Sequence, residues 1–505
     1  MKKTDGGLFG RAFWQTVLPL ALPIALQNLL MTSFRLVDTL MIGRLGDVSI
    51  AAVGLAGYAS FFVELIAFGM ASGSAVFIAQ YHGAGNRAGI MRSYGAMLSF
   101  VVPLGAAMTL FTFLCPGTVM RAFTNDPALI DEGVRYLRYA CFSYVSLTLN
   151  LAVSTVLRCT EDVRIPMVTS GIAAVTNAVL NYAFIFGAFG LPAMGVAGAG
   201  LATAISSLLN PALMLLISLK KGNIAISPLR EVFAFGKGFL PVFWKRVLPV
   251  LLNEMLWSLS IIGVNMVFGR MGTDNYAALT VERTIENLVF VFFVGICNAC
   301  NILVGKAVGA GQIDEGKRYA RRFVLLVPIL GVILGGLIVL LRAPVISLFD
   351  MTEAAAHTAR TLLLIYAVDV SIRNIPYITV VGIFRAGGDT RIGLFGDVGV
   401  QYLCVLPTVV LCGLVWKLPF LTTYLIMIAV DDALKMLVYL PHFFRMKWIK
   451  PVAGVGGEAA GAAEALLDTP DAEAAAFSPS PSPSPLSDAT EALQSSAKDD
   501  TIGTV

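Results

Sequence analysis

The feature that most constrains this chain is a series of about twelve apolar stretches, each of about 18 residues or more. They lie at 13–42, 49–79, 93–115, 133–157, 165–189, 194–218, 240–268, 276–305, 323–341, 359–384, 392–416 and 420–443. Stretches of this length can cross a bilayer as helices, which satisfy their own backbone hydrogen bonds in lipid. We therefore predict an all-α integral membrane protein with about twelve transmembrane helices.

Composition supports the membrane prediction and excludes a soluble multidomain enzyme. Of the 505 residues, 57% are hydrophobic and only 13% are charged, whereas a soluble chain carries about a quarter charged residues. The first apolar stretch is too long for a cleavable signal peptide, so we interpret it as a span.

The distribution of Lys and Arg predicts the orientation of the chain. With the N-terminus inside, the inner connections hold about 21 Lys and Arg residues and the outer ones about 6. Both termini are therefore expected in the cytoplasm, with the chain in the cytoplasmic (inner) membrane. This basic character records topology and does not indicate a nucleic-acid partner.

The net charge of +4 combines two unlike parts. Residues 451–505 carry a net charge of −8, so residues 1–450 carry +12. The acidic Ala-, Ser- and Pro-rich part is expected to be a disordered tail, whose removal at about residue 450 should leave activity intact. The other predicted parts are a cytoplasmic N-terminus (1–12), an N-lobe (13–218), a cytoplasmic linker (219–239) and a C-lobe (240–450).

The chain repeats itself at a shift of about 226 residues. The shift places Pro23 on Pro249 and Gly43-Arg44 on Gly269-Arg270. Each half holds six predicted spans, so the halves share one orientation and are expected to be related by a pseudo-twofold axis along the membrane normal. Such a duplication favours a carrier that alternates access by rocking one lobe against the other.

Ionisable residues inside spans are the primary candidates for function, because an unpaired charge in the bilayer is costly. We predict that Asp38, Glu254 and Glu282 bind the coupling ion, which is H⁺ or Na⁺. A local pair with Arg35 is an alternative for Asp38. Glu254 has no basic residue within a helical turn and, as the repeat-mate of Asn28, is expected to face it across the cleft.

Helical spacing divides the remaining internal charges into pairs. In the eighth span, Arg283 is placed to neutralise Glu286 and to leave Glu282 free. Two further pairs at i and i+4 are expected to be structural: Asp369 with Arg373, and Asp431 with Lys435. Glu64 and Asp397 receive no role.

Substrate contacts are predicted for a small polar set. Asn177 and Asn181 lie at i and i+4 on one face of the fifth span, where they could serve a ligand or bond neighbouring helices. The full predicted substrate-binding set is Asn28, Asn177, Asn181, Glu286 and Asp369. No cofactor or bound metal is expected beyond the coupling ion, with Na⁺ an option at Asp38 or Glu254, and we expect the protein to act as a monomer.

Several motifs together resemble the multidrug and toxic compound extrusion (MATE) transporters. They are Leu22-Pro23, Val37-Asp38-Thr39 with Gly43-Arg44-Leu45-Gly46, Asn181-Tyr182-Ala183, Gly195-Val196-Ala197-Gly198, Val304-Gly305-Lys306, and Phe384-Arg385-Ala386-Gly387-Gly388-Asp389. The resemblance covers residues 13–445 in order.

The resemblance implies twelve helices in two lobes and export of organic cations, as drugs or metabolites, by antiport with H⁺ or Na⁺. Asp38 matches the family's first-helix aspartate, and Asn181 lies in its fifth-helix polar motif. Two departures put the C-lobe ion site in doubt. Glu254 comes about one turn earlier than the glutamate of some bacterial members, and Arg373 stands where those members often have an acid.

Other classes of protein fit the sequence less well. A lipid-precursor flippase of the related superfamily and a narrow-specificity metabolite exporter stay as alternatives. The loop Gln80–Arg87 lacks the acid-and-basic motif of major-facilitator carriers. With only three His, and with Cys297 and Cys300 inside an apolar run, catalysis and a redox or metal role are disfavoured. No nucleotide-binding Gly-rich loop is present, which argues against ATP-driven pumping.

Overall fold

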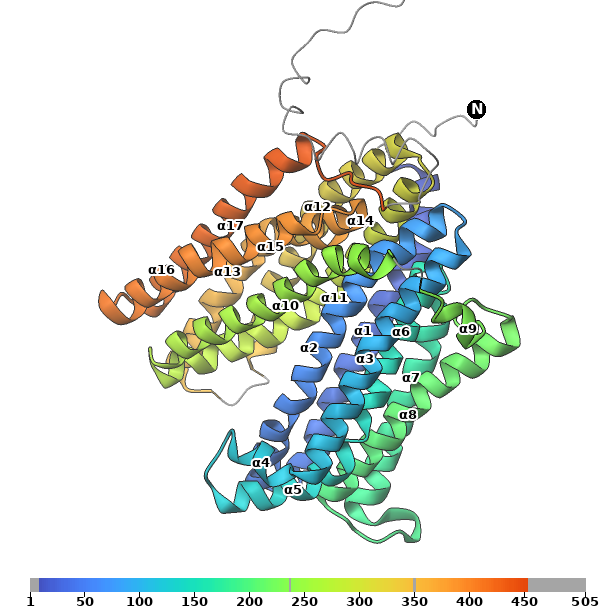
Figure 1. The fold of residues 1–505 in the computed structure, drawn as a ribbon. Helices are drawn as coiled ribbons and strands as arrows, with labels where there is room; N and C mark the ends of the chain where they lie inside the picture. The colour runs from blue at the N-terminus through green and yellow to red at the C-terminus, as the bar shows by residue number, and fades with distance from the viewer. Residues whose placement is uncertain (1–8, 236–237, 348–350, 453–505) are drawn as a thin grey trace, which may run out of the picture. The chain divides into compact units, whose positions relative to one another are not determined.

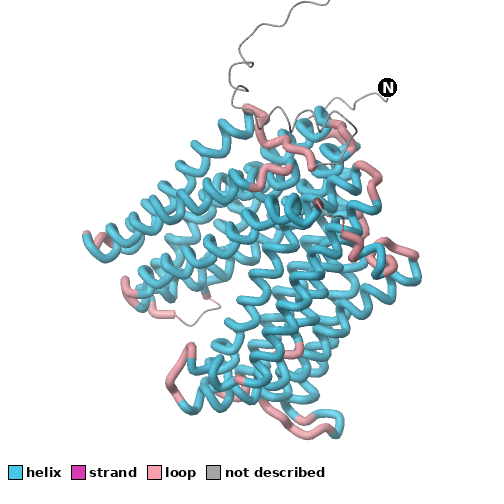
Figure 2. Tube along the Cα trace, viewed as in Figure 1, coloured by secondary structure: helices cyan, strands magenta, loops and turns pink. Residues whose placement is uncertain are grey.

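A computed structural model describes residues 9–235, 238–347 and 351–452 of the chain. These residues form helices joined by loops (Figures 1 and 2), with an isolated bridge between Gly388 and Ile449. The predicted all-α class is therefore confirmed. Residues 1–8 of the predicted N-terminus and residues 453–505 of the predicted tail lie outside the described residues.

The N-lobe is built from the first eight α-helices. They are α1 (Arg11–Gly43), α2 (Asp47–Gly83), α3 (Arg87–Leu114), α4 (Pro116–Arg121), α5 (Pro127–Ala140), α6 (Ser143–Cys159), α7 (Arg164–Phe186) and α8 (Val196–Lys221), with a short 3₁₀ turn, η1 (Ala188–Gly190). A single helical turn, α9 (Leu229–Val232), lies in the linker that follows.

The C-lobe repeats this pattern with more irregular helices. Its elements are α10 (Phe239–Gly269), α11 (Thr273–Gly309), α12 (Ile313–Ile346), α13 (Glu353–Tyr377), η2 (Ile378–Phe384), α14 (Arg385–Gly387), α15 (Arg391–Val400), η3 (Gln401–Val405), α16 (Leu406–Val410), η4 (Leu411–Val415) and α17 (Phe420–Phe444). The segments η2, η3 and η4 are π-helical, and they keep α13–α14 and α15–η4 continuous as two long spans.

Ten helices of the described residues are long and apolar enough to cross a membrane, and α5 with α6, bent by 50°, brings the number to eleven if the pair is counted as one span. The helix α17 occupies the place of the twelfth predicted stretch; it carries Asp431, Asp432 and Lys435 in its middle. Large apolar side chains on the outside suit a hydrocarbon solvent, including Leu208 on α8 and Leu340 on α12, which are 61% and 75% exposed. The chain is a multi-pass membrane protein.

Polar side chains cap the N-terminal ends of several helices. Asn86 accepts a hydrogen bond from the Gly89 N–H at 2.9 Å ahead of α3, and Asp126 accepts one from the Ala128 N–H at 2.9 Å ahead of α5. These side chains satisfy N–H groups that have no partner within the helix. Both helices therefore begin at a capping residue, several residues before the apolar stretches at 93–115 and 133–157.

The two lobes contact each other at one end of the bundle, which we call the closed end. It comprises the first halves of α1 and α10 and the last halves of α2 and α11. The start of α1 joins the apolar core of the C-lobe, where Phe13 packs on Phe323 of α12 with ring centroids 5.6 Å apart. The start of α10 joins the N-lobe core in the same way, where Phe243 packs on Phe77 at 5.2 Å. This reciprocal exchange fits the duplicated halves.

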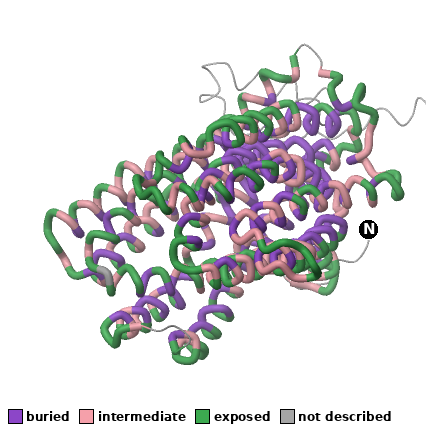
Figure 3. The backbone as a smooth tube through the Cα atoms, turned by 90° about the horizontal axis from the view of Figure 1, so that it is seen from below, coloured by how far each residue is buried: buried purple, intermediate pink, exposed green. Residues whose placement is uncertain are grey.

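Glycines allow α2 and α11 to approach closely at the closed end. A Cβ atom at Gly309 would collide with the carbonyl of Gln80, and one at Gly83 would collide with the carbonyl of Lys306. Small residues at a helix crossing let the backbones pack without an intervening side-chain layer. Buried residues accordingly concentrate where helices pack together (Figure 3).

Candidate functional site

The N-lobe places Asp38 in a neutral polar site. The Nδ2 atom of Asn181 on α7 donates to Asp38 Oδ1 on α1 at 2.6 Å and to Asn177 Oδ1 at 3.1 Å. Asn177 in turn donates to Ser206 Oγ on α8 at 3.1 Å. Three helices thus meet at one carboxylate, and the predicted polar face of the fifth span points to it.

Two further oxygen-bearing groups lie beside the Asp38 carboxylate. The side-chain oxygen of Asn181 is buried and accepts no hydrogen bond. Tyr136 of α5 lies close to the Asp38 carboxylate. The site therefore offers a carboxylate, an amide oxygen without a donor and a phenol, which are oxygen ligands suited to H⁺ or Na⁺.

No ion pair reaches Asp38 among the described residues. Arg35 instead forms an ion pair with Glu64 of α2 at 2.9 Å. The alternative of a local Arg35–Asp38 pair is therefore wrong, and Arg35 is the partner of Glu64. Arg158, inside the N-lobe, donates to Gln27 at 2.7 Å. Gln27 lies eleven residues before Asp38 on α1, which corresponds to about 16 Å along the helix. Asp38 is therefore a carboxylate held by neutral groups.

The C-lobe holds a connected set of charges centred on Glu286. Arg283 lies 2.6 Å from Glu286 and Arg373 of α13 lies 3.0 Å from it. The predicted neutralisation of Glu286 by Arg283 is confirmed. Glu282 is fully buried, its two oxygens make no hydrogen bond, and its contact with Arg283 is long at 3.9 Å. Glu282 is the free carboxyl group of this helix, as the spacing predicted.

The other charge pairs of the C-lobe also form, although with different strengths. Lys435 lies 2.9 Å from Asp431 and 3.7 Å from Asp397. Arg373 lies 3.8 Å from Asp369, farther than from Glu286. The predicted pair of Asp369 and Arg373 is therefore the weaker of two contacts made by one guanidinium.

Acids outnumber bases in this C-lobe cluster. Six acids face three bases: Glu282, Glu286, Asp369, Asp397, Asp431 and Asp432 against Arg283, Arg373 and Lys435. The Asp432 carboxyl lies close to that of Asp369. The cluster therefore accepts positive charge, although most of its acids are already engaged.

Glu254 has a basic partner, contrary to the sequence expectation. Arg385, which follows η2, approaches its carboxylate to 2.7 Å and donates to Ser72 Oγ of α2 at 2.8 Å. Arg385 is only 2% exposed. The sequence could not show this pair because the partners lie 131 positions apart. Glu254 belongs to the closed end, where Arg385 bridges both lobes.

The predicted facing of Asn28 and Glu254 is not supported. The Nδ2 atom of Asn28 donates to the carbonyl of Ile24 on its own helix at 2.9 Å. Glu254 is engaged by Arg385. The two repeat-mates therefore make separate contacts in this structure.

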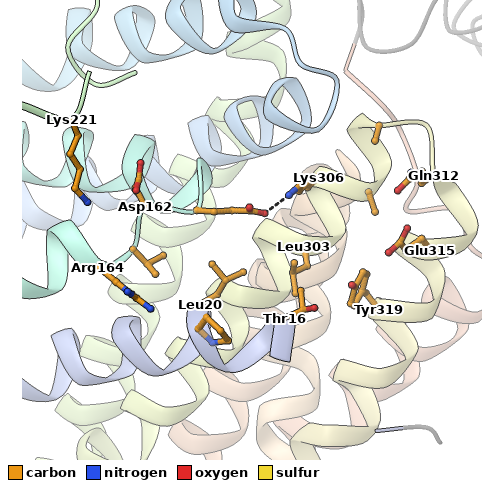
Figure 4. Close-up of a pocket in the computed structure, with 15 residues that line it drawn as sticks. Thr16, Leu20, Asp162, Arg164, Lys221, Leu303, Lys306, Gln312, Glu315 and Tyr319 are labelled. Atoms are coloured by element: carbon orange, nitrogen blue, oxygen red, sulfur yellow. Dashed lines mark hydrogen bonds and ion pairs between the residues drawn. The ribbon is translucent and has the colours of Figure 1, made fainter. Parts of the chain in front are cut away.

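A cavity of about 720 Å³ opens beside the closed end (Figure 4). It is lined by both lobes, with Arg164 and Lys221 from the N-lobe and Glu315 and Tyr319 from α12. At its edge Lys306 of α11 pairs with Glu161 at 2.6 Å. This pair is a further polar contact between the lobes.

Sequence reasoning missed several residues of these sites. Tyr136 and Ser206 lie in apolar or small-residue runs that carry no sign of the site. Arg385 lies in the family-like motif Phe384-Arg385-Ala386-Gly387, and this motif was the one sequence feature that pointed to it. Its partner could come only from the packing of α2, α10 and α14.

The family profile MatE matches this chain twice, at residues 23–183 and 249–408. The two matches begin 226 residues apart, which is the shift of the internal repeat. Together they cover more than half of the chain and confirm its duplicated halves.

Curated relatives and solved structures agree with this match. The chain is 28% identical over 358 residues to the probable multidrug resistance protein YoeA of Bacillus subtilis, covering 70% of this chain and 77% of the relative. It is 27% identical over 341 residues to the probable multidrug resistance protein NorM of Thermotoga maritima, covering 66% and 71%.

The fold is that of known transporters. A crystal structure of a MATE protein in its bent conformation superposes with a TM-score of 0.78 at 19% identity, covering 89% of this chain and 99% of that one. A MOP superfamily transporter from Pyrococcus furiosus superposes with a TM-score of 0.77 at 19% identity, covering 89% and 100%. With its two profile matches and this fold, the chain belongs to the MATE family of transporters.

Proposed function

We propose that this protein is a secondary antiporter that exports organic cations in exchange for H⁺ or Na⁺, with Asp38 as the principal site of the coupling ion. The observation that carries the proposal is the Asp38 carboxylate, held by Asn181 at 2.6 Å with no basic partner among the described residues. A carboxylate of this kind inside a membrane protein needs a proton or a metal cation.

Cationic substrates fit the excess of internal acids in the C-lobe cluster. They also fit the names of the relatives, which are multidrug resistance proteins. Glu282 is the second candidate for the coupling ion, because it is buried and lacks a close cation. Among the predicted substrate residues, Glu286 and Asp369 are held by Arg373, and Asn177 and Asn181 serve the Asp38 site.

Transport by alternating access follows from the closed end. In this proposal the closed end lies at the cytoplasmic side of the inner membrane, as the excess of Lys and Arg in the inner connections predicts. Lobes joined there would separate to admit substrate from the cytoplasm. In this proposal Glu254 is not the coupling-ion site that the sequence predicted, because its carboxylate forms an ion pair with Arg385 while the lobes are joined.

Proteoliposomes with an imposed pH or Na⁺ gradient test the proposal. Ethidium efflux should follow one of the two gradients, and Asp38→Asn should abolish it because the amide cannot exchange the ion. Asp47→Asn, an exposed carboxylate on the next helix, is the matched control and should transport normally.

The assay also separates the alternatives. Undiminished gradient-driven efflux by Asp38→Asn would show that Asp38 is not the coupling site. If neither gradient moves an organic cation, a lipid-precursor flippase or a narrow metabolite exporter becomes the better description.

A further inference from the structure

The chain after α17 folds back onto the closed end. We call residues 446–452 the strap. Arg246 of α10 donates through Nη1 to the carbonyls of Gly388 and Lys450, each at 2.8 Å, and through Nη2 to the carbonyl of Pro451 at 3.1 Å. The Lys450 N–H donates to the Gly387 carbonyl at 2.7 Å. The strap is thus fastened to the C-lobe through its backbone.

A buried aromatic pair and two glycines form the surface on which the strap packs. Trp448 is fully buried and stacks on Phe443 with ring centroids 6.4 Å apart and planes 4° apart. A Cβ atom at Gly387 would collide with this indole, and one at Gly388 would collide with the Lys450 carbonyl. Gly388 also has a φ of +97°, which favours glycine. The Gly387-Gly388 pair is therefore required for the strap to dock.

The last described residue of the strap crosses to the N-lobe. The Val452 N–H donates to Gln80 Oε1 of α2 at 2.7 Å, and Gln80 Nε2 donates to the Ala386 carbonyl at 2.8 Å. Gln80 and Val452 are both fully buried, and Val452 packs in the N-lobe core with Phe77 and Tyr81. One N-lobe side chain therefore holds two backbone groups of the C-lobe.

We propose that the strap is a latch that stabilises the closed end and must release Gln80 before the lobes can separate there. Opening breaks both bonds of Gln80 and exposes Val452, and a buried amide that loses its partners is costly. The latch therefore biases the transporter toward the state with its closed end shut. It also revises the predicted tail, because Pro451 and Val452 contact the lobes.

Spin-label distances in the full chain test the latch. Labels at Arg92→Cys on α3 and Arg321→Cys on α12, both exposed, report the separation of the lobes near the closed end after the seven native cysteines are replaced. Val452→Pro removes the N–H donor, and Gln80→Leu removes both hydrogen bonds. The ratio of separated to joined lobes should rise about tenfold in Val452→Pro and further in Gln80→Leu.

Two controls separate the strap from the rest of the chain. A stop after residue 456 keeps Val452 in place and should leave the distance distribution unchanged. A stop after Lys450 removes Val452 without inserting proline and should act like Val452→Pro. Unchanged ratios in Gln80→Leu and in the Lys450 stop would overturn the latch.

The inference rests on the alternating access proposed above, and the two can fail separately. Loss of all gradient-driven transport in the unsubstituted chain would count against the antiporter. The distance ratios test the strap whether or not the coupling ion is assigned correctly.

Discussion

The two lobes hold their internal charges in different ways. In the N-lobe, Asp38 is hydrogen-bonded by Asn181 and has no basic partner among the described residues. In the C-lobe, Glu286 is clamped between Arg283 and Arg373. A carboxylate with neutral partners can exchange a cation, whereas one between two guanidiniums is already neutralised. The duplicated halves thus differ in how their internal carboxylates are held: by amides in the N-lobe and by guanidiniums in the C-lobe.

The largest expected effect comes from removing the central base of the C-lobe cluster. Arg373→Ala leaves Glu286 with one partner and Asp369 with none of its bases, in a lobe where acids already dominate. Breaking a buried ion pair costs about 3 kcal/mol or more, so we expect a loss of that size in the free energy of unfolding. Thermal unfolding of the detergent-solubilised protein measures it.

Arg360→Ala is the matched control for Arg373→Ala, because Arg360 is exposed on the same helix. It should leave the unfolding midpoint unchanged. An equally stable Arg373→Ala protein would show that the C-lobe cluster does not depend on its bases, and the contrast with Asp38 would disappear.

A smaller effect is expected in the N-lobe from Asn181→Ala. This change removes the amide that donates to Asp38 and the oxygen beside it, while the carboxylate stays. A hydrogen bond to a charged group contributes about 1.5 kcal/mol or more, which corresponds to about a tenfold change. Gradient-driven efflux should therefore fall about tenfold, and the free energy of unfolding should fall by about 1.5 kcal/mol, less than in Arg373→Ala.

Thr176→Ala, on the same helix, controls for Asn181→Ala. The Thr176 side chain is half-buried, and its hydroxyl donates to the Ile172 carbonyl of its own helix at 2.9 Å. It should transport normally. Equal efflux by Asn181→Ala and Thr176→Ala would show that the Asp38 site does not depend on its neutral partners.

The smallest effect is expected from Glu64→Gln. The side chains of Glu64 and Arg35 are 38% and 65% exposed, and an ion pair that is open to water contributes less than about 1 kcal/mol. Efflux and the unfolding midpoint should stay near those of the unsubstituted chain. A large loss of efflux would instead indicate that Arg35, once released, turns to Asp38 and competes with the coupling ion.

Much of the fold was predictable because it depends on local properties. Each of the twelve apolar stretches falls on one helix or on consecutive helical segments, with ends that differ by up to ten residues. The bend of 50° between α5 and α6 was not predicted, nor were the π-helical segments of the C-lobe, because an apolar run fixes the length of a span but not its curvature.

The site was predictable only in part. Spacing along one helix correctly paired Arg283 with Glu286 and Lys435 with Asp431. It did not find the partners of Arg35 and Glu254, which come from other helices. An i, i+4 interval is set by the helix itself, but a partner on another helix depends on how the two helices are rotated and packed.

The amino-acid sequence alone was enough to predict the membrane class, the order of the helices, the duplicated halves and the family, although it predicted about twelve spans where the described residues hold ten or eleven. These properties follow from hydrophobic length, periodicity and motifs, which any segment of chain carries alone. Only the tertiary structure decided that Asp38 is met by Asn181, that Glu254 is held by Arg385 and that the strap reaches Gln80. Those contacts join residues more than 100 positions apart, and they form only where packed helices bring polar groups together inside an apolar solvent.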